Sequence, residues 1–128
     1  MVAEKKETKG IPQASAKVKH LRSSARKARL VVNEVRGKKV GDALALLQFS
    51  ISKHIARDVE KLIRSAVANL ENKNSDINID LKDIVVKTIF VDEGTTLKRF
   101  QPKAQGRAGR ILKRMCHISV TVASDAGK

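Results

Sequence analysis

The sequence predicts an α+β fold in which three helices pack on a small antiparallel β-sheet and a long, extended basic β-hairpin leaves that sheet. Three observations support this fold. Apolar residues recur at helical spacing in the middle of the chain, alternate at strand spacing near its ends, and are sparse over residues 92–115. The length of 128 residues fits a single domain, which we place at residues 14–128 after a disordered tail at residues 1–13.

The first expected element is a short edge strand over residues 14–21. Here Ala14, Ala16 and Val18 alternate with Lys17 and Lys19, and such partial alternation is typical of a strand with one covered face.

Three helices are expected next. Ser24 can cap the first helix and Gly37 can end it, and its apolar positions (Ala28, Val31, Val32, Val35) follow the helical period. Val40, Ala43, Leu44 and Leu47 repeat this spacing in a shorter helix. The third helix, with Ser52 as its N-cap, carries the longest apolar stripe, which consists of Ile55, Val59, Leu62, Ile63, Ala66 and Leu70.

Two further strands complete the sheet. Residues 84–91 form an almost continuous β-branched and aromatic run, which predicts a well-buried central strand. Residues 116–123 alternate cleanly, which predicts a strand with one buried face that pairs with the strand at residues 84–91. In this interpretation Phe49, Phe90 and Cys116 all belong to the core.

Charge and composition restrict the class of protein. The net charge of +14 and pI near 10.4 favour a polyanionic partner. An apolar content of 41% argues against a chain disordered throughout, and no apolar run approaches a bilayer-spanning length or a secretory signal. One cysteine permits no internal disulfide, so we expect a cytoplasmic protein. His20, His54 and His117 show no metal-ligand or catalytic spacing, so we expect no enzyme, cofactor or metal.

The positive charge lies at the two ends of the chain. Residues 1–39 and 94–128 carry +9 and +7, whereas residues 40–93 carry −2. No acidic residue occurs between Gly94 and Ser124. A solvated loop would not need this length, so we interpret residues 92–115 as a basic arm that binds nucleic acid through phosphate.

Fifteen basic residues are candidate RNA contacts, and they come from the first strand, the first helix and the arm. On the third helix, possible Glu60–Arg64 and Asp58–Lys61 pairs predict a self-neutralised face. Phe100 is the one candidate for base stacking. The candidate RNA contacts are Lys17, Lys19, Arg22, Arg26, Lys27, Arg29, Arg36, Lys38, Lys98, Arg99, Lys103, Arg107, Arg110, Lys113 and Arg114.

Several motifs, in order, resemble the family of bacterial large-subunit ribosomal protein twenty-two. They are RSS at 22–24, VRGK at 35–38, SAVAN at 65–69, IFVDEG at 89–94, KRFQPKAQGRA at 98–108, ILKR at 111–114 and HI at 117–118. The departures are Thr95 and Thr96 where a proline is usual, Leu70 where alanine is usual, and an extended tail.

This resemblance implies a structural constituent of the large ribosomal subunit that binds its RNA, aids assembly and acts as a monomer within the ribosome. It further implies neighbouring ribosomal proteins as partners and a hairpin tip that lines the nascent-peptide exit tunnel, near where macrolides bind, and so meets the nascent peptide. The implied tip consists of Leu97, Lys98, Arg99, Phe100, Gln101, Pro102, Lys103, Ala104, Gln105, Gly106, Arg107, Ala108 and Gly109.

Two other hypotheses remain open from the residues. An architectural DNA-binding protein could grip the minor groove with a basic β-ribbon arm, and such proteins usually need two arms, hence a dimer. A small RNA-modifying enzyme would require a cofactor site.

Overall fold

Ten elements follow one another closely in the described part of the chain. The computed structural model describes residues 11–76 and 78–125, so most of the predicted tail at residues 1–13 lies outside the described residues. The elements are β1 (Gln13–Leu21), α1 (Ala25–Val35), α2 (Val40–Gln48), α3 (Lys53–Lys73), a 3-10 turn (Leu81–Asp83), β2 (Ile84–Glu93), β3 (Leu97–Pro102), β4 (Ala108–Lys113) and β5 (Cys116–Ser124). Another 3-10 turn, Ala104–Gly106, joins β3 to β4.

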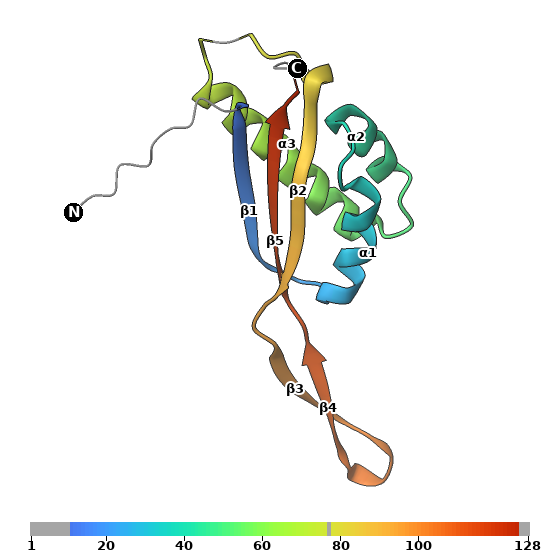
Figure 1. Cartoon of the computed structure of the whole chain (residues 1–128). Coiled ribbons are helices and arrows are strands. Elements are labelled where there is room, and N and C mark those ends of the chain that lie inside the picture. The colour runs from blue at the N-terminus through green and yellow to red at the C-terminus, as the bar shows by residue number, and fades with distance from the viewer. Residues whose placement is uncertain (1–10, 77, 126–128) are drawn as a thin grey trace, which may run out of the picture.

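Strands β1, β5 and β2 form an antiparallel sheet in that order, and the helices cover one of its faces (Figure 1). The predicted α+β fold is confirmed. The prediction that residues 84–91 form the central strand is wrong, because β5 pairs on both sides and β2 lies at an edge. The continuous apolar run suggested a strand that is buried throughout, but only alternate β2 side chains face the helices.

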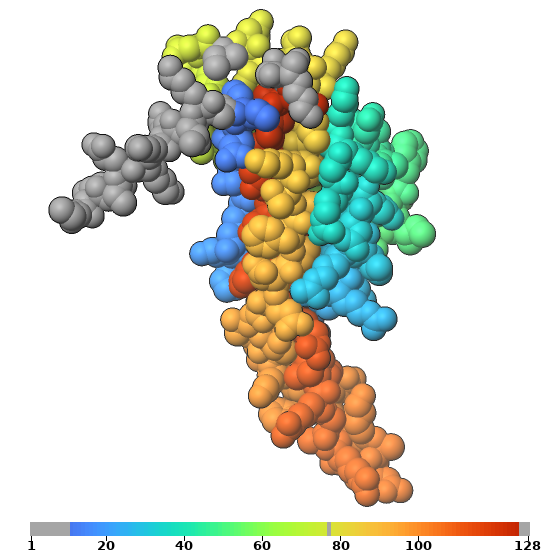
Figure 2. All heavy atoms as spheres, in the orientation of Figure 1, coloured from blue at the N-terminus to red at the C-terminus, as the bar shows by residue number. Residues whose placement is uncertain are grey.

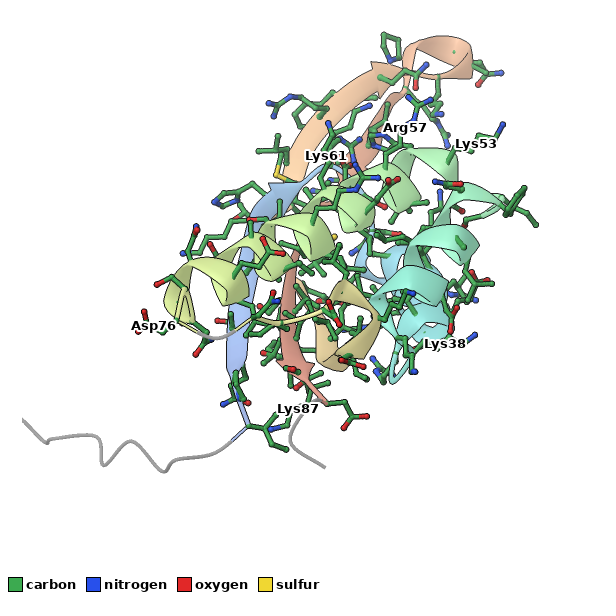
Figure 3. All side chains as sticks on the ribbon, turned by 90° about the horizontal axis from the view of Figure 1, so that it is seen from above. Lys38, Lys53, Arg57, Lys61, Asp76 and Lys87 are labelled. Atoms are coloured by element: carbon green, nitrogen blue, oxygen red, sulfur yellow. The ribbon has the colours of Figure 1, made fainter. Side chains whose placement is uncertain are left out.

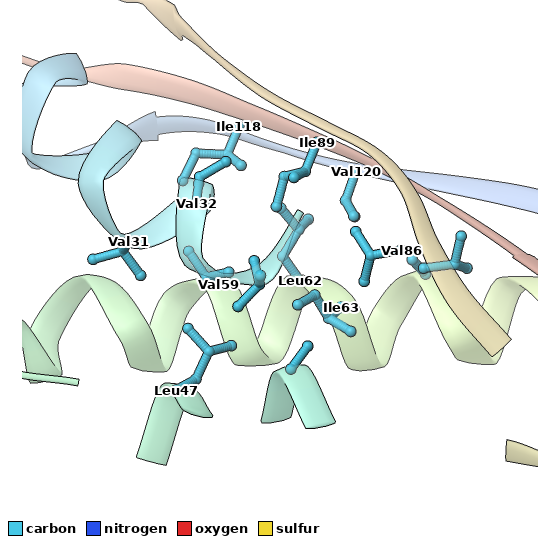
Figure 4. Close-up of a cluster of buried hydrophobic side chains, with 14 of the residues drawn as sticks. Val31, Val32, Leu47, Val59, Leu62, Ile63, Val86, Ile89, Ile118 and Val120 are labelled. Atoms are coloured by element: carbon cyan, nitrogen blue, oxygen red, sulfur yellow. The ribbon is translucent and has the colours of Figure 1, made fainter. Parts of the chain in front are cut away.

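The core lies between the sheet and the helices. Alternate residues of β5, from Cys116 to Val122, are buried against α3, whose predicted stripe is buried along its whole length (Figure 4). Phe49 and Phe90 were expected in this core, but they are 86% and 47% exposed. Phe49 follows the last turn of α2, and Phe90 points to the sheet face that no helix covers.

Local signals positioned the ends of α1 correctly. The Ser24 side chain accepts a hydrogen bond from the backbone N–H of Lys27, and Gly37 adopts a φ of +76°, which favours glycine. Ser52 occupies the N-cap of α3, but its side chain makes no capping hydrogen bond. No helix among residues 11–76 and 78–125 is both long and apolar enough to span a membrane.

Strands β3 and β4 form a separate two-stranded hairpin that projects from one end of the sheet, away from the helices (Figures 1 and 2). Each strand has six residues, so the paired part is about 20 Å long. The hairpin continues β2 and β5, so the body of the protein fixes its direction.

Candidate nucleic-acid interface

The hairpin carries its positive charge on both faces. Cross-strand pairing places Phe100 opposite Arg110 on one face, and Leu97 opposite Lys113 and Arg99 opposite Ile111 on the other. Phe100 is 76% exposed, and its neighbours in β3 are also exposed. Because each face presents cations and neither presents an acid, a polyanion could contact the hairpin from every side.

The distal end of the hairpin is a tight turn between Lys103 and Arg107. The backbone N–H of Lys103 donates to the carbonyl of Arg107 at 2.6 Å, and Gln105 and Gly106 both have positive φ. The predicted tip, residues 97–109, thus comprises the whole of β3, this turn and the start of β4.

Gly109 makes room for the side chain of Lys103. A Cβ atom at Gly109 would lie 2.6 Å from Lys103 Cε and 2.7 Å from its Cγ. The aliphatic part of Lys103 therefore folds back over the glycine while its ammonium stays exposed.

Two hydrogen bonds hold the base of the hairpin, and one of them comes from the body. The N–H of Gly94 donates to the carbonyl of Met115 at 2.8 Å, and Arg22 Nη1 donates to the carbonyl of Arg114 at 2.9 Å. A Cβ atom at Gly94 would lie only 3.1 Å from the backbone of Met115. The two backbone segments therefore approach so closely here that a larger residue at position 94 would force them apart.

Two of the arginines predicted as RNA contacts donate hydrogen bonds to the outer edge of β2. Arg29 Nη2 donates to the carbonyl of Val91 at 3.1 Å, and Arg36 donates to the carbonyl of Ile89 from Nε and Nη2, at 3.3 and 2.9 Å. An edge strand exposes unpaired carbonyls that can recruit other chains, and these guanidinium groups occupy two of them. Beside them, Gly37 and Lys38 pair with Val86 through their backbone.

The other candidate RNA contacts of the body lie in two separate places. Lys17 and Lys19 are exposed on the open face of the sheet, where Ser119 of β5 pairs with Lys17 on one side and Phe90 on the other. Arg26, Lys27 and Lys38 are exposed near α1. The structure therefore does not gather all the predicted residues into one surface.

Part of the basic surface lies on α3 and was not predicted from the sequence. The Glu60–Arg64 ion pair forms at 2.6 Å, but no Asp58–Lys61 pair is found among the described residues. Lys53, Arg57 and Lys61 lie on the outer face of α3 (Figure 3). Their spacing of four residues was the signal that could have revealed them.

A groove joins this surface to the hairpin. It has a volume of about 820 Å³ and lies between the starts of α1 and α3 and the base of β4. Its basic lining residues are Arg22, Lys27, Lys53 and Arg114.

His20, His117 and Cys116 have structural roles. The N–H of His20 donates to Nδ1 of His117 at 3.0 Å, and the two rings meet edge to face at 5.0 Å. Burial raises the pKa of the Cys116 thiol, and the positive charge of Arg29 partly offsets this. Among the described residues, no cluster of His, Cys, Asp or Glu could hold a metal ion.

The chain was compared with models of protein families. The family model described as ribosomal protein L22p/L17e matches residues 16–123. The matched region begins in β1 and ends in β5, so it includes all three helices and the hairpin.

Proposed function

This chain belongs to the ribosomal protein L22p/L17e family, and on that premise we propose that its hairpin binds large-subunit ribosomal RNA and that the hairpin turn lines the nascent-peptide exit tunnel. Family membership makes the chain a structural constituent of the large ribosomal subunit and not an enzyme. Because the chain belongs to this family, the ribosomal function takes precedence over the alternatives of an architectural DNA-binding protein and an RNA-modifying enzyme.

The observation that carries the RNA proposal is the charge distribution of the hairpin. Six basic residues occupy residues 97–113, no acid does, and cations appear on both of its faces. Each lysine or arginine that neutralises a phosphate releases condensed counterions, and this release supplies salt-dependent affinity. An isolated two-stranded ribbon is marginal in water, so RNA on both faces would stabilise it. Exposed Phe100 beside Arg110 adds a site where an unstacked base could pack.

The RNA proposal is tested by competition at fixed, near-physiological salt. A large-subunit ribosomal RNA fragment competes with duplex DNA for the full chain, and we expect the RNA to be preferred. The variant Lys98→Gln/Arg99→Gln/Arg110→Gln should lose most of that preference, whereas Lys39→Gln/Lys73→Gln/Lys82→Gln, with the same change of charge, should keep it. Equal binding of RNA and DNA by the unmodified chain would contradict the proposal.

The tunnel proposal requires its own measurement. Gln105 lies in the turn and is exposed, so a thiol placed at this position would be accessible. Ribosomes that contain Gln105→Cys should crosslink to a stalled nascent peptide through the new thiol, while those with Lys82→Cys should not. Because the native Cys116 is buried, it does not compete for the reagent. Absence of a crosslink from position 105, with RNA binding intact, would remove the tunnel assignment alone.

A further inference from the structure

We propose that the groove at the hairpin base is a second RNA site, in which one strand of ribosomal RNA passes between the body and the hairpin with its phosphates on Lys27, Lys53 and Arg114. This inference rests on the proposed function and extends it from the hairpin to the body. The groove brings together residues that are far apart in the sequence, from the β1–α1 junction, the start of α3 and the end of β4.

The charge of the groove favours an anion. Its lining includes Arg22, Lys27, Lys53 and Arg114 and no acidic side chain. The ion pair found among the described residues joins Glu60 to Arg64, so none of the four groove cations has an acidic partner there. Four cations that converge on one cavity repel one another, and a phosphate chain relieves that repulsion.

One of the four cations is held in place before any ligand arrives. Arg22 is anchored through Nη1 to the carbonyl of Arg114, which leaves its Nε and Nη2 free in the described structure. An oriented guanidinium loses less conformational entropy on binding phosphate than a free lysine does. Arg22 thus positions the groove wall, and its remaining N–H groups can donate hydrogen bonds to a phosphate.

The size and remaining lining of the groove suit a nucleotide chain. A volume of about 820 Å³ lies near the upper end of ordinary ligand sites. Ile51, which is fully exposed, and Leu112, 44% exposed, add apolar surface beside the cations. A nucleotide presents this combination of a charged phosphate and apolar faces on its sugar and base.

The position of the groove favours RNA over an acidic protein segment. Leu112 and Arg114 belong to the hairpin arm itself, so a strand that follows β4 toward the body enters the groove directly. From there Arg57 and Lys61 continue the basic surface along α3 (Figure 3). A single polyanion can therefore contact the hairpin, the groove and α3 in succession.

The first test compares two double variants of the full chain in binding to a large-subunit ribosomal RNA fragment. Lys27→Gln/Lys53→Gln should lower affinity about tenfold and reduce the slope of log affinity against log salt by about 1.5. The control Lys73→Gln/Lys82→Gln has the same change of charge, and Lys73 lies at the opposite end of α3, about 30 Å from Lys53. We expect the control to lose less than threefold.

The second test locates the RNA. An iron chelate attached to Ile51→Cys in assembled large subunits should cleave ribosomal RNA by hydroxyl radicals, and one attached to Lys82→Cys should give a different pattern. Cleavage of a neighbouring protein but not of RNA from position 51 would overturn the inference in favour of a protein partner.

The outcomes separate the two proposals. If neutralising the hairpin abolishes RNA preference while the groove variant behaves as its control, the groove is not an RNA site and the proposed function stands. If the unmodified chain shows no preference for ribosomal RNA, the proposed function fails, and the groove inference fails with it.

Discussion

Arg22 donates a hydrogen bond from Nη1 to the carbonyl oxygen of Arg114 at 2.9 Å, across 92 positions of sequence. The bond ties the segment that leaves β1 to the segment that joins β4 to β5. The other contact at the hairpin base is the hydrogen bond from the N–H of Gly94 to the carbonyl of Met115. The direction of the hairpin is therefore set by a small number of polar contacts at its base.

Loss of the Arg22 side chain should loosen the hairpin base. In the free protein, Arg22→Ala should increase amide hydrogen exchange at Gly94 by about threefold to tenfold, because the opposing chain is no longer held. The control is Arg26→Ala, which removes a neighbouring exposed arginine that makes no side-chain hydrogen bond in the described structure; it should leave that exchange unchanged. Equal exchange in both variants would show that Arg22 does not position the base.

The arginines at the edge of β2 should contribute to stability. Arg29→Ala and Arg36→Ala each remove donors from carbonyls of β2, and each should lower the free energy of unfolding by about 1 kcal/mol. Arg26→Ala on the same helix should stay within about 0.5 kcal/mol of the unmodified protein. Urea denaturation measures the difference, and three equal values would mean that the edge contacts contribute nothing.

Gly94 should tolerate no side chain. In Gly94→Ala the new Cβ would meet the backbone carbonyl group of Met115 at 3.1 Å, and we expect a loss of about 1–3 kcal/mol in the free energy of unfolding. Gly41→Ala is the control, since Gly41 lies in α2 with nothing within 4 Å of its Cβ position, and alanine there should be neutral or stabilising. The prediction fails if Gly94→Ala is as stable as Gly41→Ala.

Two apolar residues should differ sharply in their contribution to stability. Ile63 is fully buried on α3, so Ile63→Ala should cost about 2–5 kcal/mol. Phe49 is 86% exposed, so Phe49→Ser should change the free energy of unfolding by less than about 0.5 kcal/mol. Thermal or urea unfolding measures both changes. A large loss in the free energy of unfolding for Phe49→Ser would mean that Phe49 packs in the core after all.

The Cys116 thiol should make stability fall in alkaline solution. Burial raises its pKa above 9.0 in the folded state, so above that pH the unfolded chain loses the thiol proton first. Stability is then fully present below pH 9.0 and declines as pH rises toward the folded pKa, by up to about 1.4 kcal/mol per unit. The pH profile of Cys116→Ala should lack this component. Parallel profiles for the two proteins above pH 9.0 would contradict the raised pKa.

Local patterns determined much of this protein. The apolar stripe of α3, the Ser24 cap and the Gly37 stop of α1, and the alternation in β5 each depend on neighbours within a few residues, and each appears in the structure where it was expected. The acid-free arm was equally visible, because charge can be counted without coordinates.

Tertiary structure alone decided which strand is central, which phenylalanines are buried and how the cations are used. An apolar run does not reveal whether a strand pairs on one side or two, so β2 was taken for the centre of the sheet and Phe90 for a core residue. In the sequence Arg22, Arg29 and Arg36 look like any other basic residues, yet each donates to a carbonyl at least 50 positions away. The groove at the hairpin base depends on the same long-range proximity, which only folding creates, because local spacing carries no information about which distant backbone groups will lie within hydrogen-bond distance.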